Sequence, residues 1–310
     1  MMKAMRLTNT TGGATLVEES VSQPMPGPGG ILVRVCAAGV IPTELGWYPT
    51  THTKTGETRS GAVPGHEFSG IVAAVGDGVT GVEIGQEIYG MNDWFADGAT
   101  AEYCVTLPAS IAAKPKSLSH IEAASVPISA LTAWQGLFDR AKLQAGERVL
   151  VHGGAGAVGI FAVQLARSRG AHVIATASEQ NLAFVSGLGA DEVIDYRKER
   201  FEDRAGKVDV VFDTVGGETL QRSWGTLKKD GRMVAIASDV EGTDDPKLKA
   251  AFFIVEPNRE QLEGVARTLD EGTLRTFVSA TVPFEQAGQA YANGQVSKVG
   301  PGKIVVAIAE

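Results

Sequence analysis

The stretch VLVHGGAGAVG at residues 149–159 constrains the fold of this chain more than any other feature. Its first residues form an apolar, β-branched run that predicts a buried strand, and the segment IFAVQLARSRG that follows has helical periodicity. Between them, Gly154, Gly156 and Gly159 have the spacing G-x-G-x-x-G. In such a turn the first glycine permits a tight bend, the second lets a pyrophosphate approach the backbone, and the third lets helix and strand pack closely.

Glycines placed in this way between a strand and a helix predict a dinucleotide-binding site. The helix begins with free N–H groups and the positive end of its dipole, and both attract phosphate. An ordinary glycine-rich turn of an α/β protein is the alternative interpretation. The residues assigned to the predicted phosphate site are Gly154, Ala155, Gly156, Ala157, Val158 and Gly159.

Size and charge narrow the class of protein. A chain of 310 residues is long enough for two domains with separate hydrophobic cores. Its net charge of −8 argues against a general affinity for nucleic acid or an anionic membrane, so we expect neither of those partners. No segment has the apolar length of a signal peptide or a membrane span, so the expected location is the cytoplasm.

The two cysteines, Cys36 and Cys104, form no CxxC pair. This excludes a four-cysteine zinc lobe and argues against a disulfide framework. We expect both side chains to be small buried hydrophobic groups.

Patterning divides the chain into a β-rich part and a part in which strands and helices alternate. Short apolar runs separated by glycine and proline turns fill the first part, to about residue 125. The alternation that follows predicts a parallel sheet with right-handed crossovers. The tail returns to strand patterning and is expected to rejoin the first domain. The strands predicted for the parallel sheet are 148–152, 172–177, 192–196, 208–214 and 232–238.

Two local expectations accompany this division. Ser119 followed by Glu122 has the spacing of a capping box and predicts the start of a helix. The segment EGTDDPKLKA at 241–250 is polar and is expected to be mobile.

The ordered series of motifs resembles the medium-chain dehydrogenase/reductase superfamily. The resemblance implies an α/β fold that combines a GroES-like β-rich catalytic domain, residues 1–125 and 271–310, with a Rossmann domain, residues 126–270, whose parallel sheet is doubly wound. It also implies a homodimer. The matching segments are AAGVIPTELG at 37–46, PGHEFSGIVAAVG at 64–76, DGATAEYCV at 97–105, AASVPISALTAW at 123–134, VLVHGGAGAVG, LGADEVIDY at 188–196 and GKIVV at 302–306.

Within that superfamily the chain resembles the zinc-independent quinone oxidoreductase branch. The zinc alcohol dehydrogenases place ligands at positions that here hold Ile41, His66 and, for the last, a residue near Ile128. Two of these are aliphatic, and one imidazole beside Glu67 makes a poor catalytic zinc site, because three protein ligands are usual. We therefore expect no metal and interpret His66 as a structural residue, hydrogen-bonded beneath the active site.

The resemblance and the strand ends favour NADPH (NADP⁺) as the cofactor. NAD sites commonly carry an acidic residue at the end of the second strand, where this chain has Ala177 and then Ser178. Tyr196 matches a tyrosine that contacts the 2′-phosphate in the resembled branch. The basic pair 197–198 is either added positive charge or ordinary solvated surface, and Glu179 is unfavourable unless it points away. The resemblance also places near the cofactor Thr132, Thr214, Val215, Phe253, Ile254, Val255 and Lys303.

A proton must follow the hydride, and two hydroxyl groups are candidate donors. Thr43 occupies the position of the hydroxyl relay of the zinc enzymes, and Tyr48 is the second candidate, with solvent as the alternative to both. Trp47, Trp94 and Phe95 are candidate walls of a quinone-sized pocket, with ordinary packing as the alternative for each.

The sequence therefore predicts a zinc-independent, NADPH-dependent oxidoreductase that transfers hydride to quinones first and to α,β-unsaturated carbonyl compounds second. Reduction of a saturated ketone ranks lower, because it needs stronger polarisation, typically by a Lewis acid. The alternative from another class is an NADPH-binding redox sensor without turnover.

Overall fold

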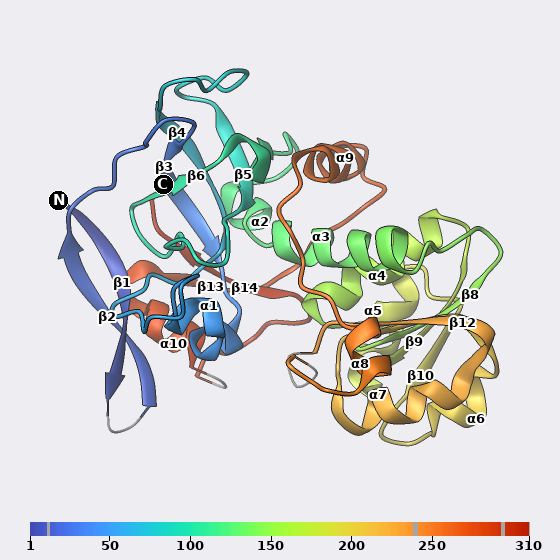
Figure 1. Cartoon of the computed structure of the whole chain (residues 1–310). Helices are drawn as coiled ribbons and strands as arrows, with labels where there is room; N and C mark the ends of the chain where they lie inside the picture. The colour runs from blue at the N-terminus through green and yellow to red at the C-terminus, as the bar shows by residue number, and fades with distance from the viewer. Residues whose placement is uncertain (11–12, 238–240, 293–294, 310) are drawn as a thin grey trace. The chain divides into compact units, whose positions relative to one another are not determined.

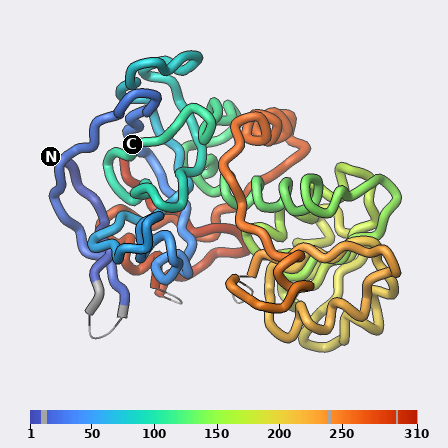
Figure 2. The backbone as a smooth tube through the Cα atoms, in the orientation of Figure 1, coloured from blue at the N-terminus to red at the C-terminus, as the bar shows by residue number. Residues whose placement is uncertain are grey.

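The computed structural model describes residues 1–10, 13–237, 241–292 and 295–309, and the chain forms two compact units. The first contains Met1–Ile128 and Glu256–Glu310, and the second contains Ser129–Val255. The N-terminal and C-terminal segments, blue and red in Figure 2, both run through the first unit. Ser238 and Glu310, which end two of the predicted ranges, lie outside the described residues.

Strand β3 (Ile31–Gly39) is the centre of the first unit. One of its edges pairs antiparallel with β4 (Glu67–Val75), and the other pairs with β6 (Tyr103–Thr106) and β14 (Lys303–Ala307). The C-terminal tail therefore completes a sheet that the N-terminal part begins. The other elements of this unit are β1 (Met2–Thr10), β2 (Gly13–Val21), α1 (Tyr48–Thr51), β5 (Glu87–Met91), β7 (Ile111–Ala113), α2 (His120–Ala123), α9 (Arg259–Asp270), β13 (Val278–Pro283) and α10 (Ala287–Tyr291).

The core of the first unit explains why β3 is a strand. Its residues Ile31, Val33 and Val35 are fully buried and pack with Phe68 of β4 and Ile88 of β5. Burial of each of these large side chains contributes about 1.5–3 kcal/mol, and β-branched residues suit a pleated surface.

The second unit is built on a parallel sheet, five-stranded over the described residues, in the order β10-β9-β8-β11-β12 (Figure 1). The order reverses direction at β8, so the carboxyl ends of β8 and β11 form a topological switch point. This confirms the doubly wound α/β fold. The elements of this unit are α3 (Pro127–Trp134), which crosses its boundary, the π-helix Gln135–Arg140, β8 (Arg148–His152), α4 (Ala157–Ser168), β9 (His172–Ala177), α5 (Leu182–Gly187), β10 (Glu192–Asp195), α6 (Phe201–Ala205), β11 (Val208–Asp213), α7 (Gly217–Ser223), β12 (Leu227–Ala235) and α8 (Pro246–Ala251).

Each predicted strand of this sheet is present, because its sequence signal is a continuous apolar run. Val149, Leu150 and Val151 of β8 are fully buried, as expected for a sheet covered on both faces. Only the ends differ: β10 and β11 each stop one residue before the predicted end, and β12 runs from Leu227 to Ala235 rather than over 232–238. No helix within the described ranges is long and apolar enough to cross a membrane.

Helix α9 belongs to the first unit, although we expected residues 126–270 to form the Rossmann domain. It packs against β7, and the hydroxyl of Tyr89 in β5 donates a hydrogen bond to the carbonyl oxygen of Leu262 at 2.6 Å. The boundary therefore lies between Val255 and Glu256. The amphipathic pattern of a helix shows that one face is buried but does not show which sheet it covers.

Segment 241–250, for which the sequence analysis predicted no helix, contains the start of α8. Asp245 caps the helix by accepting the N–H of Lys247 at 2.8 Å, and Pro246 occupies its first turn. By contrast, the capping box of Ser119 and Glu122 is confirmed at the start of α2. Both cysteines are buried and free, also as expected.

We predict that Tyr89→Phe weakens the attachment of α9 by about 0.5–1.5 kcal/mol, since it removes a buried hydrogen bond and little else. Urea unfolding followed by tryptophan fluorescence measures the loss. The control is Tyr103→Phe, whose hydroxyl bonds to none of the described residues and whose change stays within about 0.5 kcal/mol. Equal stability of the two variants contradicts the role of the Tyr89 hydroxyl.

Candidate functional site

Strand β8 ends at His152 and α4 begins at Ala157, so four residues form the turn between them. Gly153 has φ +74°, which L side chains rarely adopt, and a Cβ there would lie 2.6 Å from the hydroxyl oxygen of Thr214. A Cβ on Gly159 would fall on the carbonyl oxygen of Gly153. Helix and turn therefore touch backbone to backbone, which requires glycine at both positions.

The structure corrects one glycine assignment. We expected Gly154 to make the tight bend, but the positive φ belongs to Gly153. Gly154 instead lies in a crowded place, where a Cβ would be 3.0 Å from Val185 and 3.1 Å from Ala175. The available signal was the pair of consecutive glycines directly after the strand.

The start of α4 presents backbone donors at this turn. Gly156 is the N-cap, and its carbonyl oxygen accepts the N–H of Ile160 at 3.0 Å. The N–H groups of Ala157, Val158 and Gly159 precede that bond, and such first-turn groups have no acceptor within their own helix. With Gly156 exposed beside them, they form a positively polarised cradle that fits the pyrophosphate of a dinucleotide.

Ser178 and Tyr196, the residues expected at the 2′-phosphate, lie together at the carboxyl edge of the sheet. Strands β9 and β10 pair with Ala177 opposite Asp195, and the N–H of Tyr196 donates to the carbonyl oxygen of Ala177 at 3.3 Å. Tyr196 is 53% exposed. The side-chain amide of Asn181 donates to the Ser178 hydroxyl at 3.2 Å. Two residues separated in sequence thus lie side by side at one edge of the sheet.

The carboxylate of Glu179 is balanced by a neighbouring cation. Its Oε1 accepts a hydrogen bond from Lys198 Nζ at 2.5 Å, and both side chains are exposed. Arg197 lies 5.6 Å from the centre of the Tyr196 ring. The basic pair therefore lies at the predicted 2′-phosphate position, where it offsets the unfavourable charge of Glu179.

The end of β11 adjoins the glycine turn. The hydroxyl of Thr214 donates to the carbonyl oxygen of His152 at 2.8 Å, which brings this predicted cofactor residue to the phosphate turn. Asp213 Oδ1 accepts the N–H groups of Val215 at 2.6 Å and Gly216 at 2.8 Å and so fixes the loop after the strand. The Val215 side chain is 54% exposed, so it offers apolar surface to a ligand.

The remaining cofactor candidates of the second unit divide by burial. Phe253 and Val255 are buried, whereas Ile254 between them is 47% exposed. The N–H of Phe253 donates to the carbonyl oxygen of Ala235 at 3.3 Å, which holds this segment beside β12. Thr132 is buried in α3. Of these four side chains, Ile254 alone has a large surface to offer a ligand.

The two candidate proton donors belong to the first unit. Thr43 is exposed on the 3₁₀ turn Pro42–Gly46, and Tyr48 is 51% exposed. The Tyr48 ring stacks on His52, with centroids 4.4 Å apart and planes 6° from parallel. Both hydroxyl groups can therefore exchange protons with solvent.

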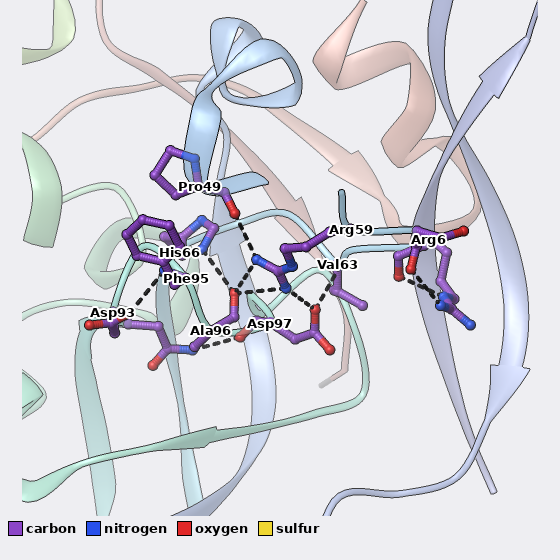
Figure 3. A network of polar contacts seen from close by, with 12 residues as sticks. Arg6, Pro49, Arg59, Val63, His66, Asp93, Phe95, Ala96 and Asp97 are labelled. Atoms are coloured by element: carbon purple, nitrogen blue, oxygen red, sulfur yellow. Dashed lines mark hydrogen bonds and ion pairs between the residues drawn. The ribbon is translucent and has the colours of Figure 1, made fainter. Parts of the chain in front are cut away.

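The predicted aromatic walls lie close to a polar network that holds segment 93–97 (Figure 3). The carbonyl oxygen of Ala96 accepts hydrogen bonds from His66 Nε2 at 3.2 Å and from Arg59 at 3.4 Å, and Arg59 also donates to Asp97 at 2.7 Å. Trp94, in the same segment, lies 5.3 Å from the ring of His66. An edge-to-face contact, with ring centroids 5.3 Å apart, joins Trp94 to Trp47.

His66 is buried, and both of its ring nitrogens are engaged. Nδ1 lies 2.5 Å from Glu44 Oε1, and Nε2 donates to Ala96. Burial lowers the pKa of His66, but the Glu44 carboxylate and the two hydrogen bonds together raise it above its ordinary value. Ile41 and Ile128 offer no donor atoms, and within the described ranges no three His, Cys, Asp or Glu side chains gather to hold a metal. The donor set at this place does not fit zinc.

Lys303, which we expected near the cofactor, is buried in an ion pair with Glu67. Glu67 Oε2 also accepts the N–H of Ile128 at 3.0 Å, so the carboxylate joins β4, β14 and the start of α3. Burial raises the pKa of Glu67, and the Lys303 ammonium opposes that rise. All three residues belong to the first unit. The sequence carried no signal for this pair, because its members are 236 residues apart.

We predict that Lys303→Met destabilises the first unit by about 3–5 kcal/mol, because it leaves the buried Glu67 carboxylate without its counter-charge. The matched control is Lys54→Met, which breaks an exposed pair with Asp93 and costs at most about 1 kcal/mol. Urea unfolding of the three proteins measures both changes. Similar losses in the two variants contradict a buried ionised pair.

Two family models match parts of the chain on either side of the glycine turn. The alcohol dehydrogenase GroES-like domain matches residues 27–117, and the zinc-binding dehydrogenase model matches residues 188–306. The first spans β3 to β7, and the second runs from the residues before β10 into the C-terminal tail.

Individual relatives extend the match over nearly the whole chain. A probable zinc-binding oxidoreductase, mitochondrial, of Arthroderma benhamiae is 31% identical over 93% of this chain and 92% of its own length. The NADPH-dependent alkenal/one oxidoreductase, chloroplastic, of Arabidopsis thaliana is 32% identical over 89% of this chain and 71% of its own. The structure of the quinone oxidoreductase from Coxiella burnetii superposes with a TM-score of 0.87 at 30% identity and covers 99% of both chains.

Proposed function

Because the chain belongs to the medium-chain dehydrogenase/reductase superfamily, in its quinone-oxidoreductase-like branch, it is an oxidoreductase, and we propose that NADPH is its reductant. The backbone cradle at 156–159 is the observation that carries the proposal, since the first N–H groups of α4 are offered there to a pyrophosphate. The choice of NADPH rests on Ser178 beside Tyr196, where an NAD-specific site commonly has a carboxylate.

The proposed reaction is hydride transfer to a quinone or, second, to an α,β-unsaturated carbonyl compound. When bound, the dinucleotide supplies the hydride, and the protein binds and orients it. The names of two relatives, a quinone oxidoreductase and an alkenal/one oxidoreductase, support these two acceptor classes. At 30–32% identity they support the class of acceptor and leave the individual substrate open.

We also propose that the reaction proceeds without zinc. The aliphatic side chains at 41 and 128 and the two occupied nitrogens of His66 support this, although one matching family model is that of zinc-binding dehydrogenases. An electron-poor acceptor needs no Lewis acid, whereas a saturated ketone typically does. The exposed hydroxyl groups of Thr43 and Tyr48, or solvent, supply the proton. The homodimer and the cytoplasmic location remain predictions from the sequence.

The test of this function is NADPH oxidation by metal-free protein, with an ortho-quinone, an enone and a simple ketone compared side by side. We expect turnover with the quinone and the enone and none with the ketone. Tight NADPH binding with no turnover on any acceptor contradicts the proposal and favours the redox sensor. Turnover with the ketone that depends on added zinc contradicts the metal-free mechanism.

We predict that Ser178→Asp raises the preference for NADH over NADPH by about tenfold or more, because a carboxylate at the strand end repels the 2′-phosphate. The ratio of kcat/KM for the two cofactors measures the change. The control is Ser168→Asp, the same change at the far end of α4, which leaves the ratio as it is in the unmodified protein. Unchanged NADPH preference in Ser178→Asp removes the 2′-phosphate assignment.

A further inference from the structure

His152 is the last residue of β8 and directly precedes the glycine turn, yet the proposed function gives its side chain no role. The side chain is buried, and its ring lies edge-on to Phe201 at 4.5 Å. Its two nitrogens reach hydroxyl groups on two other elements. Nδ1 is 3.2 Å from Thr176 Oγ1 in β9, and Nε2 is 2.8 Å from Ser223 Oγ in α7.

The hydrogen bonds fix which nitrogen carries the proton. The Ser223 hydroxyl donates its one hydrogen to the carbonyl oxygen of Thr219 at 2.7 Å, so it can only accept from the ring. Nε2 is therefore protonated and donates to Ser223. Burial, followed by the charge of Arg222, lowers the pKa of His152 to about 3, so the ring is neutral near pH 7 and its Nδ1 is an acceptor.

This assignment determines the orientation of the Thr176 hydroxyl. Its hydrogen is donated to Nδ1 of His152, which leaves the oxygen lone pairs to accept the N–H of Gly153 at 3.2 Å. The backbone carbonyl of the same Thr176 accepts the N–H of Gly154 at 2.9 Å. One residue of β9 therefore receives both consecutive N–H groups at the start of the turn.

A third contact closes the arrangement. The Thr214 hydroxyl donates to the carbonyl oxygen of His152 at 2.8 Å and occupies the space where a Cβ on Gly153 would lie. The strand end is thus held through its side chain by β9 and through its carbonyl by the loop after β11. The two N–H groups of Gly153 and Gly154 are consumed inside the protein, and the N–H groups at the start of α4 remain for a ligand.

We propose that His152 is a positioning residue of the dinucleotide site: through the Thr176 hydroxyl, its ring holds the glycine turn in the conformation that receives the pyrophosphate. The inference rests on the proposed function, because it assumes that this turn binds a dinucleotide. It goes beyond that function because it attributes the affinity of the turn for the dinucleotide to a buried relay, the Thr176 hydroxyl and the His152 imidazole.

A positioning role and a space-filling role for the His152 ring predict opposite rankings of His152→Asn and His152→Gln. The side-chain oxygen of asparagine takes the place of Nδ1 and can accept from Thr176, but the smaller side chain leaves a cavity. Glutamine fills more of the volume and places its amide near Nε2, but loses the acceptor beside Thr176. A positioning role therefore favours asparagine, and a space-filling role favours glutamine.

The experiment is a fluorescence titration of NADPH into the full chain and its His152→Asn, His152→Gln, Thr176→Val and Thr176→Ser variants. We expect His152→Asn and Thr176→Ser to keep the Kd within about threefold, and His152→Gln and Thr176→Val to raise it roughly tenfold, the effect of one lost hydrogen bond. The KM for NADPH rises with the Kd, while the KM for the acceptor stays constant. The double variant of His152→Gln and Thr176→Val binds NADPH no more weakly than either single variant, because the two substitutions break the same relay.

The outcomes separate this inference from the proposed function. Thr176→Val is close to isosteric and tests the relay even if the His152 variants fold poorly. An unchanged Kd in Thr176→Val, or tighter binding by His152→Gln than by His152→Asn, overturns the positioning role. Absence of NADPH and NADH binding by the unmodified protein overturns the proposed function itself.

Discussion

The contact of Gly159 with the carbonyl oxygen of Gly153 is the constraint on which the second unit depends. No side chain fits between them, so α4 begins directly against the end of β8, with its first N–H groups at the carboxyl edge of the sheet. Gly153 can face that contact only at φ +74°, and Thr214 fills the space beside it. The N–H groups at the start of α4 thus owe their position to glycine at 153 and 159, because neither residue has a Cβ that would separate the helix from the turn. The hydroxyl and imidazole groups around the turn then determine which of its N–H groups remain for a ligand.

The first unit depends on buried charge rather than on close backbone contact. Glu67 and Lys303 join strands from the two ends of the chain, and Glu44 and His66 hold the turn after β3 to the start of β4. A histidine with a carboxylate partner resembles half of a metal site, but its other nitrogen is bonded to a carbonyl oxygen and the neighbouring ligand positions are aliphatic. This arrangement supports the proposal that the acceptor is reactive enough without a Lewis acid.

The sequence predicted those parts of the structure that local chemistry determines. Fully buried parallel strands are continuous apolar runs, and a glycine motif identifies its own turn, so the sequence predicted both the sheet and the turn between β8 and α4. The sequence did not predict the unit to which α9 belongs, because the amphipathic face of this helix fits any apolar partner. The sequence also did not predict the partner of Lys303, which lies 236 residues away. It did not predict the role of His152, whose hydroxyl partners are 24 and 71 residues away. Gly153 did carry a local signal, the glycine pair directly after the strand, and Asp245-Pro246 is the local signal for the start of α8, which the sequence analysis did not use.

Hydrogen–deuterium exchange of the protein with and without NADPH tests most directly the claim that this edge of the sheet receives a dinucleotide. The account predicts slower exchange at the start of α4, residues 157–159, and at the strand ends near Ser178 and Tyr196, where the ligand is proposed to bind. Gly153 and Gly154 exchange slowly in both states, because their N–H groups are already bonded to Thr176. Protection elsewhere in the chain, with none at residues 157–159, would contradict the account.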